Sequence, residues 1–397
     1  MRRKEILLVI VLIGFGLMYE FFDSGDNGFF QGCSFNSRGL LEKTFIPFTV
    51  DESRFDGVER LEIVNKAGSI VLKPSTGSET VVRPEIRVYH RSESRAQRIR
   101  EDILVNVKAE GGTLRISTGV EGEFPFQRVR IHLEVQIPAD TFLDVRNRYG
   151  DVSIHGVGRE VDVVSKYGDF TASNLPGLKM RHGYGDIVLK DIAGLVDLQT
   201  RYGKLSIDNV RSAELKCHHT RVIANGIEEG LSLENSHQSI QCADIKGDLS
   251  IEARHCKIQI DRIESGRVVV SNSYKNVTLS DVSAENVNVL MSHGNAALDF
   301  SQITDSVSIK SKYTNIALAL PALGEPLFHI KTTYGDIRND TGIDMDIFKG
   351  KIKTTVTSEG SKPTVVIDNT YGDVHLKSVS RSNSEEKIPA EAPEIKI

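Results

Sequence analysis

The chain has no tryptophan, and aromatic residues make up only 7% of its 397 residues. The interior must therefore be built mostly of aliphatic side chains. Neither sign of charge dominates, since 49 lysines and arginines stand against 54 aspartates and glutamates. Because a dedicated nucleic-acid-binding protein usually carries a strong basic excess, we expect no nucleic-acid partner. Nucleotide-binding loops, serine nucleophile elbows and paired-histidine metalloprotease motifs are also missing from the sequence.

Cysteine is scarce as well. The four cysteines, Cys33, Cys217, Cys242 and Cys256, do not describe a disulfide framework. Cys217 and Cys256 would lie two repeats apart, which is too far for an unstrained disulfide. Cys33 follows a glycine, but its distance from the apolar N-terminal run argues against a lipoprotein acylation site.

The N-terminus combines a basic start with an apolar run. Met1-Arg-Arg-Lys-Glu precedes an uncharged stretch at residues 6–19, and no small-residue cleavage site follows it. This pattern is typical of a secretory signal or a signal anchor. We expect an uncleaved membrane anchor at residues 1–24, with its basic end in the cytoplasm; a cleaved signal is the alternative. Either way, the body of the protein would be exported to the periplasm or the cell surface.

A repeat of about 18 residues organises most of the chain. Tyr149-Gly150-Asp151 recurs with its tyrosine at steps of 18, 17 and 18 residues. We number each repeat from this aromatic residue as position 0. The series is Tyr149, Tyr167, Tyr184, Tyr202, His219, His237, His255, Tyr274, His293, Tyr313, Tyr334 and Tyr371. The last gap is twice the usual step, and we interpret it as one degenerate coil.

Apolar residues recur at positions −6, −4 and +3 in every repeat. This spacing has period two on both sides of a glycine corner, so each repeat is predicted to be a strand, a corner and a second strand. A meander of hairpins is one architecture that fits, but identical residue types at identical register favour stacked parallel coils. Small polar residues at position −2 suit the inward corner of such coils: Asn147, Ser165, Thr200, Cys217, Asn235, Asn272, Ser311, Thr332 and Asn369.

We therefore predict an all-β protein whose main part is a β-solenoid at residues 141–378. A linker at 25–55 and a small mixed β-rich cap at 56–140 precede it, and a disordered tail at 379–397 follows. The cap is expected to hold one helix, at residues 92–102. Two of its segments match the repeat template, one through Leu61, Ile63, Gly68, Ile70 and Leu72, the other through Val105, Val107, Gly112, Leu114 and Ile116.

The export signal, the Leu-x-Ile…Gly-x-Ile units and the repeated Tyr-Gly-Asp resemble the bacterial putative-adhesin family of β-strand-repeat proteins. The resemblance covers about residues 57–377. It implies a location in the cell envelope or at the cell surface, and a role in adhesion or envelope stress. It supplies no catalytic residues, and the histidine-centred coils at 219–255 depart from the Tyr-Gly-Asp pattern.

Two clusters invite a chemical interpretation. Asp151, Asp169 and Asp186 stand at position +2 of consecutive coils, where stacked carboxylates could cleave glycosidic bonds or bind calcium. Because asparagine replaces aspartate at this position elsewhere, we interpret them as corner residues that tolerate left-handed backbone. His219, His237 and His255, with cysteines nearby, could ligate zinc. Their spacing is that of the repeat, so we interpret them as planar replacements for tyrosine and expect no cofactor.

Basic residues at positions −1 and −3 form the remaining candidate site, and acidic residues run alongside at position −5. Solvation and cross-coil ion pairing explain such a face without a ligand, whereas a docking surface for an anionic envelope polymer or a protein partner explains it functionally. We hypothesise a non-enzymatic, envelope-anchored interaction or adhesion protein. The alternatives are a polysaccharide-active β-helix enzyme and a scaffold that associates end to end through an uncapped last coil. The candidate binding residues are Arg146, Arg148, Lys166, Arg181, Arg201, Lys216 and Arg254.

Overall fold

The computed structural model describes residues 45–120, 128–322 and 326–379. The expected anchor at 1–24, Cys33, most of the linker and the tail from residue 380 lie outside the described residues. The chain divides into Met1–Thr44 and Phe45–Ile397, so the predicted cap and solenoid belong to one compact unit. Among the described residues, no helix is both long and apolar enough to cross a membrane.

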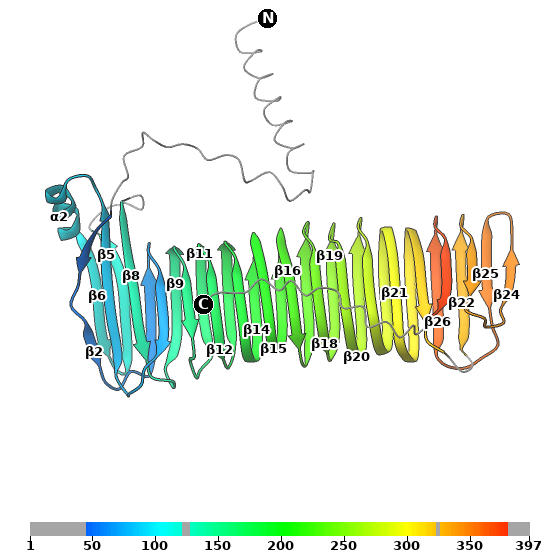
Figure 1. The fold of residues 1–397 in the computed structure, drawn as a ribbon, viewed down its shortest axis with the longest axis horizontal. Helices are drawn as coiled ribbons and strands as arrows, with labels where there is room; N and C mark the ends of the chain where they lie inside the picture. The colour runs from blue at the N-terminus through cyan, green and yellow to red at the C-terminus, as the bar shows by residue number, and fades with distance from the viewer. Residues whose placement is uncertain (1–44, 121–127, 323–325, 380–397) are drawn as a thin grey trace, which may run out of the picture. The chain divides into compact units, whose positions relative to one another are not determined.

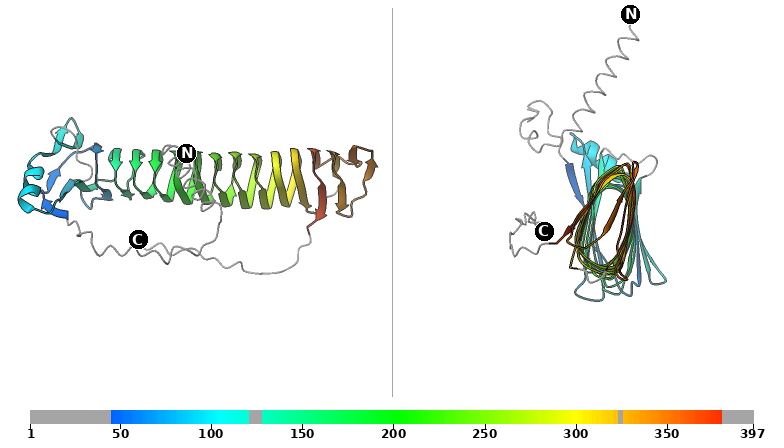
Figure 2. Two further views of the ribbon diagram at one scale, coloured as in Figure 1. Left: turned by 90° about the horizontal axis from the view of Figure 1, so that it is seen from above. Right: turned by 90° about the vertical axis from the view of Figure 1, so that its right-hand side faces the viewer.

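The described residues form an all-β solenoid in which each coil stacks on the next (Figure 1). Successive coils pair in parallel, β9 with β11 and β11 with β13 on one sheet, and β10 with β12 and β12 with β14 on the other. Seen end-on, the coils overlay as a narrow ring with two long sides (Figure 2). The strands are β9 (Phe142–Tyr149), β10 (Val152–His155), β11 (Val161–Tyr167), β12 (Phe170–Leu175), β13 (Leu178–Tyr184), β14 (Ile187–Thr200), β15 (Gly203–Cys217), β16 (Thr220–Ile227), β17 (Gly230–Ser236), β18 (Ile240–Lys246), β19 (Asp248–Arg254), β20 (Ile258–Ser273) and β21 (Val277–Leu320).

The register agrees with the repeat read from the sequence. Leu143 pairs with Val161, and Val161 pairs with Leu178, so equivalent side chains lie directly above one another. Residues at positions −6, −4 and +3 are buried in the coils, and they form one continuous aliphatic core between the two sheets. The small polar residues at position −2 are also buried, as predicted. Parallel coils, not a meander of hairpins, are therefore confirmed.

The C-terminal end does not follow the order of the sequence. Strand β26 (Thr364–Thr370) inserts between β21 and β22 (Leu327–Thr333), pairing in parallel with both. Likewise β27 (Val374–Ser378) lies between β21 and β23 (Ile337–Asp340). The Tyr371 coil thus stacks on the Tyr313 coil, and the Tyr334 coil is the outer one. The prediction of a degenerate coil between Tyr334 and Tyr371 is wrong.

The residues between those two coils form an antiparallel cap instead. Strand β25 (Lys353–Thr357) pairs antiparallel with β22, and β24 (Asp346–Lys349) pairs antiparallel with β25. Both lie at the end of the stack opposite α2 (Figure 1). The expectation of an uncapped last coil is therefore also wrong. These antiparallel strands take the place of a further coil at this end of the stack, as the atypical terminal units of repeat proteins do.

The other end is built in the same way. Strands β3 (Arg60–Asn65) and β4 (Ile70–Pro74) form a coil that lies between β7–β8 and β9–β10. Antiparallel strands complete the end, and α2 (Glu93–Glu101), the helix expected at 92–102, packs beside them. The further strands of this end are β1 (Phe45–Thr49), β2 (Ser53–Phe55), β5 (Thr80–Tyr89), β6 (Ile103–Glu110), β7 (Thr113–Val120) and β8 (Val129–Ile137).

One of the two template matches in this cap is corrected by the structure. The segment through Gly68 is a coil, with Gly68 at φ +128° at its corner. The segment through Gly112 is an antiparallel hairpin of β6 and β7. Gly111 and Gly112 both have positive φ, at 54° and 74°, as the two central residues of a type I′ turn require.

Candidate functional site

The residues at position 0 form one unbroken stack of rings along an edge of the solenoid. Neighbouring rings are nearly parallel, with centroids 4.5–5.2 Å apart and interplanar angles of 5–25°. We call this stack the aromatic ladder. Because each ring face covers the next, only ring edges and hydroxyl groups reach solvent. The ladder therefore offers no flat aromatic platform for a sugar or a base.

The corner beside the ladder needs glycine for two reasons. Gly168 and Gly185 have φ values of +127° and +137°, which L-residues rarely adopt. A Cβ on Gly168 would lie 2.4 Å from the carbonyl oxygen of Gly150 in the coil below. From the His219 coil onward the positive φ moves to position 0 itself, for example His237 at 70°.

The aspartates at position +2 have a structural role that differs from the predicted one. Their backbone is not left-handed, because the positive φ lies on the preceding glycine. Each carboxylate instead accepts a hydrogen bond from the backbone N–H at position +2 of the next coil. Asp151 Oδ1 accepts from Asp169 N, and Asp169 Oδ1 from Asp186 N, both at 2.9 Å. We call this the carboxylate ladder.

Inside the corner, asparagines at position −2 satisfy the backbone carbonyls. Asn147 Nδ2 donates to the carbonyl oxygens of Gly150, at 2.8 Å, and Gly68, at 3.1 Å. Asn272 and Asn369 make equivalent pairs of bonds in their own coils. A buried carbonyl without a partner costs free energy, so these amides stabilise the tight corner.

His182 also occupies this inward row, and the sequence analysis missed it. Its side chain is buried, and burial is the largest cause that lowers the pKa of the imidazole. The signal was available, because His182 stands two residues before Tyr184 in the row of small polar residues.

The structure brings six of the seven predicted basic residues together. Arg146, Arg148, Lys166, Arg181, Arg201 and Lys216 are all exposed and lie on five consecutive coils of one sheet. Lys66 extends the row by one coil, because β3 pairs with β9 so that Asn65 stands beside Asn147. We call these seven residues the cationic strip. Positions −1 and −3 of these six coils hold no acidic residue.

Two ion pairs with acidic residues at position −5 lie along the margin of the strip. Arg146 contacts Asp144 at 3.1 Å, and Lys179, itself at position −5, contacts Asp197 at 4.0 Å. Arg148 and Lys166 lie over their own tyrosine rings, 5.4 and 5.3 Å from the ring centroids. These contacts orient the cations along the edge of the ladder.

Arg254 lies apart from the strip. Glu234 and Glu252 occupy position −3 of the two coils beyond Lys216, and Arg254 belongs to the second of these coils. Arg254 stands at position −1, as several residues of the strip do, but the neighbouring residues at position −3 are acidic. Arg254 therefore belongs to a region of mixed charge.

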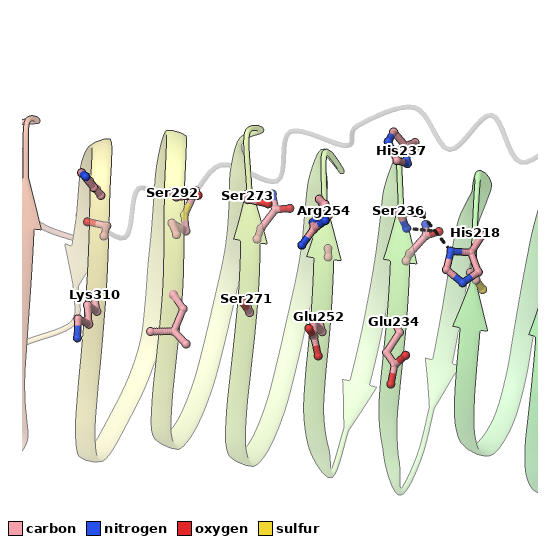
Figure 3. A pocket seen from close by; sticks show the side chains of 18 of the residues that line it. His218, Glu234, Ser236, His237, Glu252, Arg254, Ser271, Ser273, Ser292 and Lys310 are labelled. Carbon is pink, nitrogen blue, oxygen red and sulfur yellow. Dashed lines mark hydrogen bonds between the residues drawn. The ribbon is translucent and has the colours of Figure 1, made fainter.

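That region holds a groove of about 810 Å³ on the outer face of the same sheet. Small side chains, among them Ser271 and Ser273, separate the acidic Glu234 and Glu252 from Lys310 (Figure 3). His218 Nδ1 lies 3.3 Å from Ser236 Oγ at one end of the groove. Because both signs of charge line this groove, it does not continue the cationic strip.

The histidines of the ladder do not converge on a metal site. His219, His237 and His255 stack face to face, so their nitrogens lie at parallel ring edges instead of pointing to one centre. No group of three potential ligands capable of holding a metal occurs in residues 45–120, 128–322 and 326–379. Burial raises the pKa of Cys217 to about 12 and that of Cys242 to about 12, which disfavours the thiolate that zinc requires.

The chain shows similarity to solved structures and to a protein family. A search of curated proteins found no match. Among solved structures, the chain is similar to a "putative cell adhesion protein" from Clostridium sporogenes, with 8% identity, 85% of this chain and 100% of that chain covered, and a TM-score of 0.20. It is also similar to a "putative lipid binding protein" from Parabacteroides distasonis, with 11% identity, 84% and 97% covered, and a TM-score of 0.26.

A "putative adhesin" from Parabacteroides merdae gives 11% identity, 84% and 96% covered, and a TM-score of 0.25. With such scores these folds do not superpose closely on this one. The match to a family covers most of the chain and takes in nearly every coil. Residues 58–225 and 228–377 match the Toastrack DUF4097 family, and the chain belongs to this family.

Proposed function

We propose that this protein is a non-enzymatic interaction protein of the cell envelope or cell surface, and that its cationic strip binds an anionic polymer. The observation that carries the proposal is the strip itself. Seven exposed lysines and arginines lie on six consecutive coils with no acidic residue between them. The net charge of the whole chain is −5, so the strip is a local concentration of positive charge.

The geometry of the strip favours a linear ligand. Stacked coils repeat about every 4.8 Å, so the strip presents its charges in a regular row. The strands that carry the strip are hydrogen-bonded to a neighbouring strand on each side. Because the backbone is already held in place, binding costs little conformational entropy of the protein. Each exposed ion pair contributes little, but a polymer engages many at once, and its attraction should weaken with salt.

Two features support a role in binding over catalysis. The aspartates that invited a hydrolase hypothesis accept backbone hydrogen bonds and lie at exposed corners, and within residues 128–322 no long loop builds a cleft around them. Export to the envelope is supported by the N-terminal sequence, in which a basic start precedes an apolar run. Anchoring to the membrane is part of the proposal on the same basis.

The test measures binding to immobilised dextran sulfate, polygalacturonate and neutral dextran. The strip variant is the triple change Arg181→Glu, Arg201→Glu and Lys216→Glu. The matched control, Arg91→Glu, Arg95→Glu and Arg98→Glu, makes the same change of charge on exposed positions at helix α2. We expect the wild type and the control to bind both anionic polymers and not dextran, and the strip variant to lose at least about tenfold in affinity, which is 1.4 kcal/mol.

Equal affinity of the strip variant and the wild type would refute the proposal, and so would an equal loss in the control. The enzymatic alternative has its own assay, which is the release of reducing ends from the same polymers. Cleavage by the wild type that disappears when Asp151, Asp169 and Asp186 become asparagine would replace our proposal with a hydrolase.

A further inference from the structure

Position +2 changes its chemistry along the stack. It is aspartate in the Tyr149, Tyr167 and Tyr184 coils and asparagine in the Tyr274, His293 and Tyr313 coils. Between these two blocks it is Lys204, Arg221, Ser239 and Lys257. The carboxylate ladder is thus replaced over four coils by three cations and a serine. This segment lies on the flank of the aromatic ladder opposite the cationic strip.

The ladder shows what position +2 normally binds. In most coils that carry an aspartate or an asparagine there, the side-chain oxygen accepts a hydrogen bond from the backbone N–H of the next coil. Asp186 Oδ1 accepts from Lys204 N at 2.9 Å, and Asn276 Oδ1 accepts from Asn295 N at 3.0 Å. The outer coil keeps the same bond, from Asp336 N to Asp373 Oδ1 at 2.8 Å. The corner N–H is therefore a binding position for an oxygen, most often that of a carboxylate.

The coils without this oxygen leave their N–H groups uncapped. At position +2, Ser239 follows Arg221 of the preceding coil, Lys257 follows Ser239, and Asn276 follows Lys257. Among the residues that the structure describes, no acceptor bonds to the backbone N–H of these three. The three groups lie on successive coils, so they form a row with the spacing of the stack, about 4.8 Å.

A groove of about 350 Å³ opens beside this row. Its lining is cationic and polar: Arg221, His237, Ser239, His255, Lys257 and Lys275. No acidic residue lines it. Ser239 is the shortest of the three side chains that line the groove from position +2 of these coils, and it stands between Arg221 and Lys257.

We infer that this groove, which we call the corner groove, binds carboxylate groups of an anionic glycan, which take the place of the missing aspartates. Each carboxylate accepts from a corner N–H as Asp169 accepts from the N–H of Asp186 in the next coil, while Arg221, Lys257 and Lys275 neutralise the charge. Such charge-assisted bonds are about twice as strong as neutral ones. The inference does not depend on the cationic strip, because it concerns different residues on the other side of the aromatic ladder.

The decisive variant is Ser239→Asp, which restores the carboxylate ladder in the middle of the groove. The new Oδ1 stands in the register of Asp169 and accepts from the N–H of Lys257, so the variant retains its fold. It also occupies the proposed ligand position and repels an anion. Gln302→Asp adds the same charge at an exposed position on another side of the coil and is the matched control.

The probes are trigalacturonate, neutral galactotriose and tripolyphosphate, each titrated calorimetrically into the full chain. We expect trigalacturonate to bind and galactotriose not to bind. Ser239→Asp should lower the affinity for trigalacturonate about tenfold or more, because one charge-assisted hydrogen bond is lost. Gln302→Asp and the strip variant should change it less than twofold.

Several results would overturn the inference. These are no binding of trigalacturonate, equal affinity in Ser239→Asp and wild type, and tighter binding of tripolyphosphate than of trigalacturonate. Loss of trigalacturonate binding in the strip variant alone would assign the carboxylates to the strip and not to the corner groove. A strip variant that loses dextran sulfate but keeps trigalacturonate separates the two sites.

Discussion

Replacing Gly168 with alanine should destabilise the solenoid far more than its one added methyl group suggests. Gly168 has a φ of +127°, and an alanine in such a conformation costs about 1–3 kcal/mol of strain. Its Cβ would also lie 2.4 Å from the carbonyl oxygen of Gly150 and 2.5 Å from the carbonyl carbon. Both atoms belong to backbone, so no flexible side chain can move aside.

The size of the effect follows from these two contributions. The coils are held in register by hydrogen bonds on both sides of the corner, for example from Gly150 N to Tyr167 O at 2.8 Å. Relief of the overlap therefore requires a shift of the coil, and overpacking of this kind costs about 1–3 kcal/mol. We expect Gly168→Ala to lower the free energy of unfolding by about 2–6 kcal/mol in total.

Urea denaturation followed by far-ultraviolet circular dichroism measures this difference. Gly77→Ala is the matched control, because its Cβ would meet no atom within 4 Å and its φ is not positive. The control should stay within about 0.5 kcal/mol of the wild type. If Gly168→Ala unfolds at the same urea concentration as the control, the close stacking of the corners described here is incorrect.

Three further predictions concern single side chains. Asp169→Ala should cost about 0.5–1.5 kcal/mol of stability, whereas Asp169→Asn should cost much less, because an amide oxygen can accept the same backbone N–H. The pKa of His182 is lowered by burial, so its neutral form stabilises the fold above the unfolded pKa of about 6.5 and stability is lost as pH falls below it. Exchange of His182 for asparagine should flatten the dependence of the free energy of unfolding on pH between 7 and 5, by up to about 1.4 kcal/mol per pH unit. Cys217 and Cys242 should resist alkylation at pH 8 in the native state and react in urea, since both thiols are buried and have pKa values of about 12.

Each of these has a clear contrary result. Equal losses for alanine and asparagine at position 169 would mean that the hydrogen bond to the next coil does not stabilise the corner. An unchanged pH profile in the His182 variant would show that this imidazole titrates normally. Rapid alkylation of the folded protein by iodoacetamide, measured by mass spectrometry, would show that the cysteines are accessible.

The coils could be predicted from the sequence because each position repeats its residue type. Period-two burial assigns positions −6, −4 and +3 to the core, and stacking then places like residues above like, as the pairing of Leu143 with Val161 shows. The ends could not be predicted in this way. The repeat identifies which segments are coils, but it does not say in which order they stack, and β26 lies between β21 and β22 against the order of the chain.

Local chemistry explains two other differences. Gly111-Gly112 resembles the corner of a coil in composition, yet two consecutive residues of positive φ turn the chain back on itself and form a hairpin. For the candidate site, offsets from position 0 identify which basic residues share a row. The same offsets place Glu234 and Glu252 at position −3, and the pairing of β15, β17 and β19 confirms that they separate Arg254 from the others.

The salt dependence of binding to dextran sulfate tests the role of the cationic strip most directly. Affinity of the wild type and of the variant with Arg181→Glu, Arg201→Glu and Lys216→Glu is measured from 50 to 500 mM sodium chloride, chosen because the Debye length falls from more than about 10 Å to less than about 8 Å over this range. We predict a steep loss of wild-type affinity with salt and a weaker, flatter curve for the variant. Coincident curves, or wild-type binding that does not respond to salt, would contradict the proposed function.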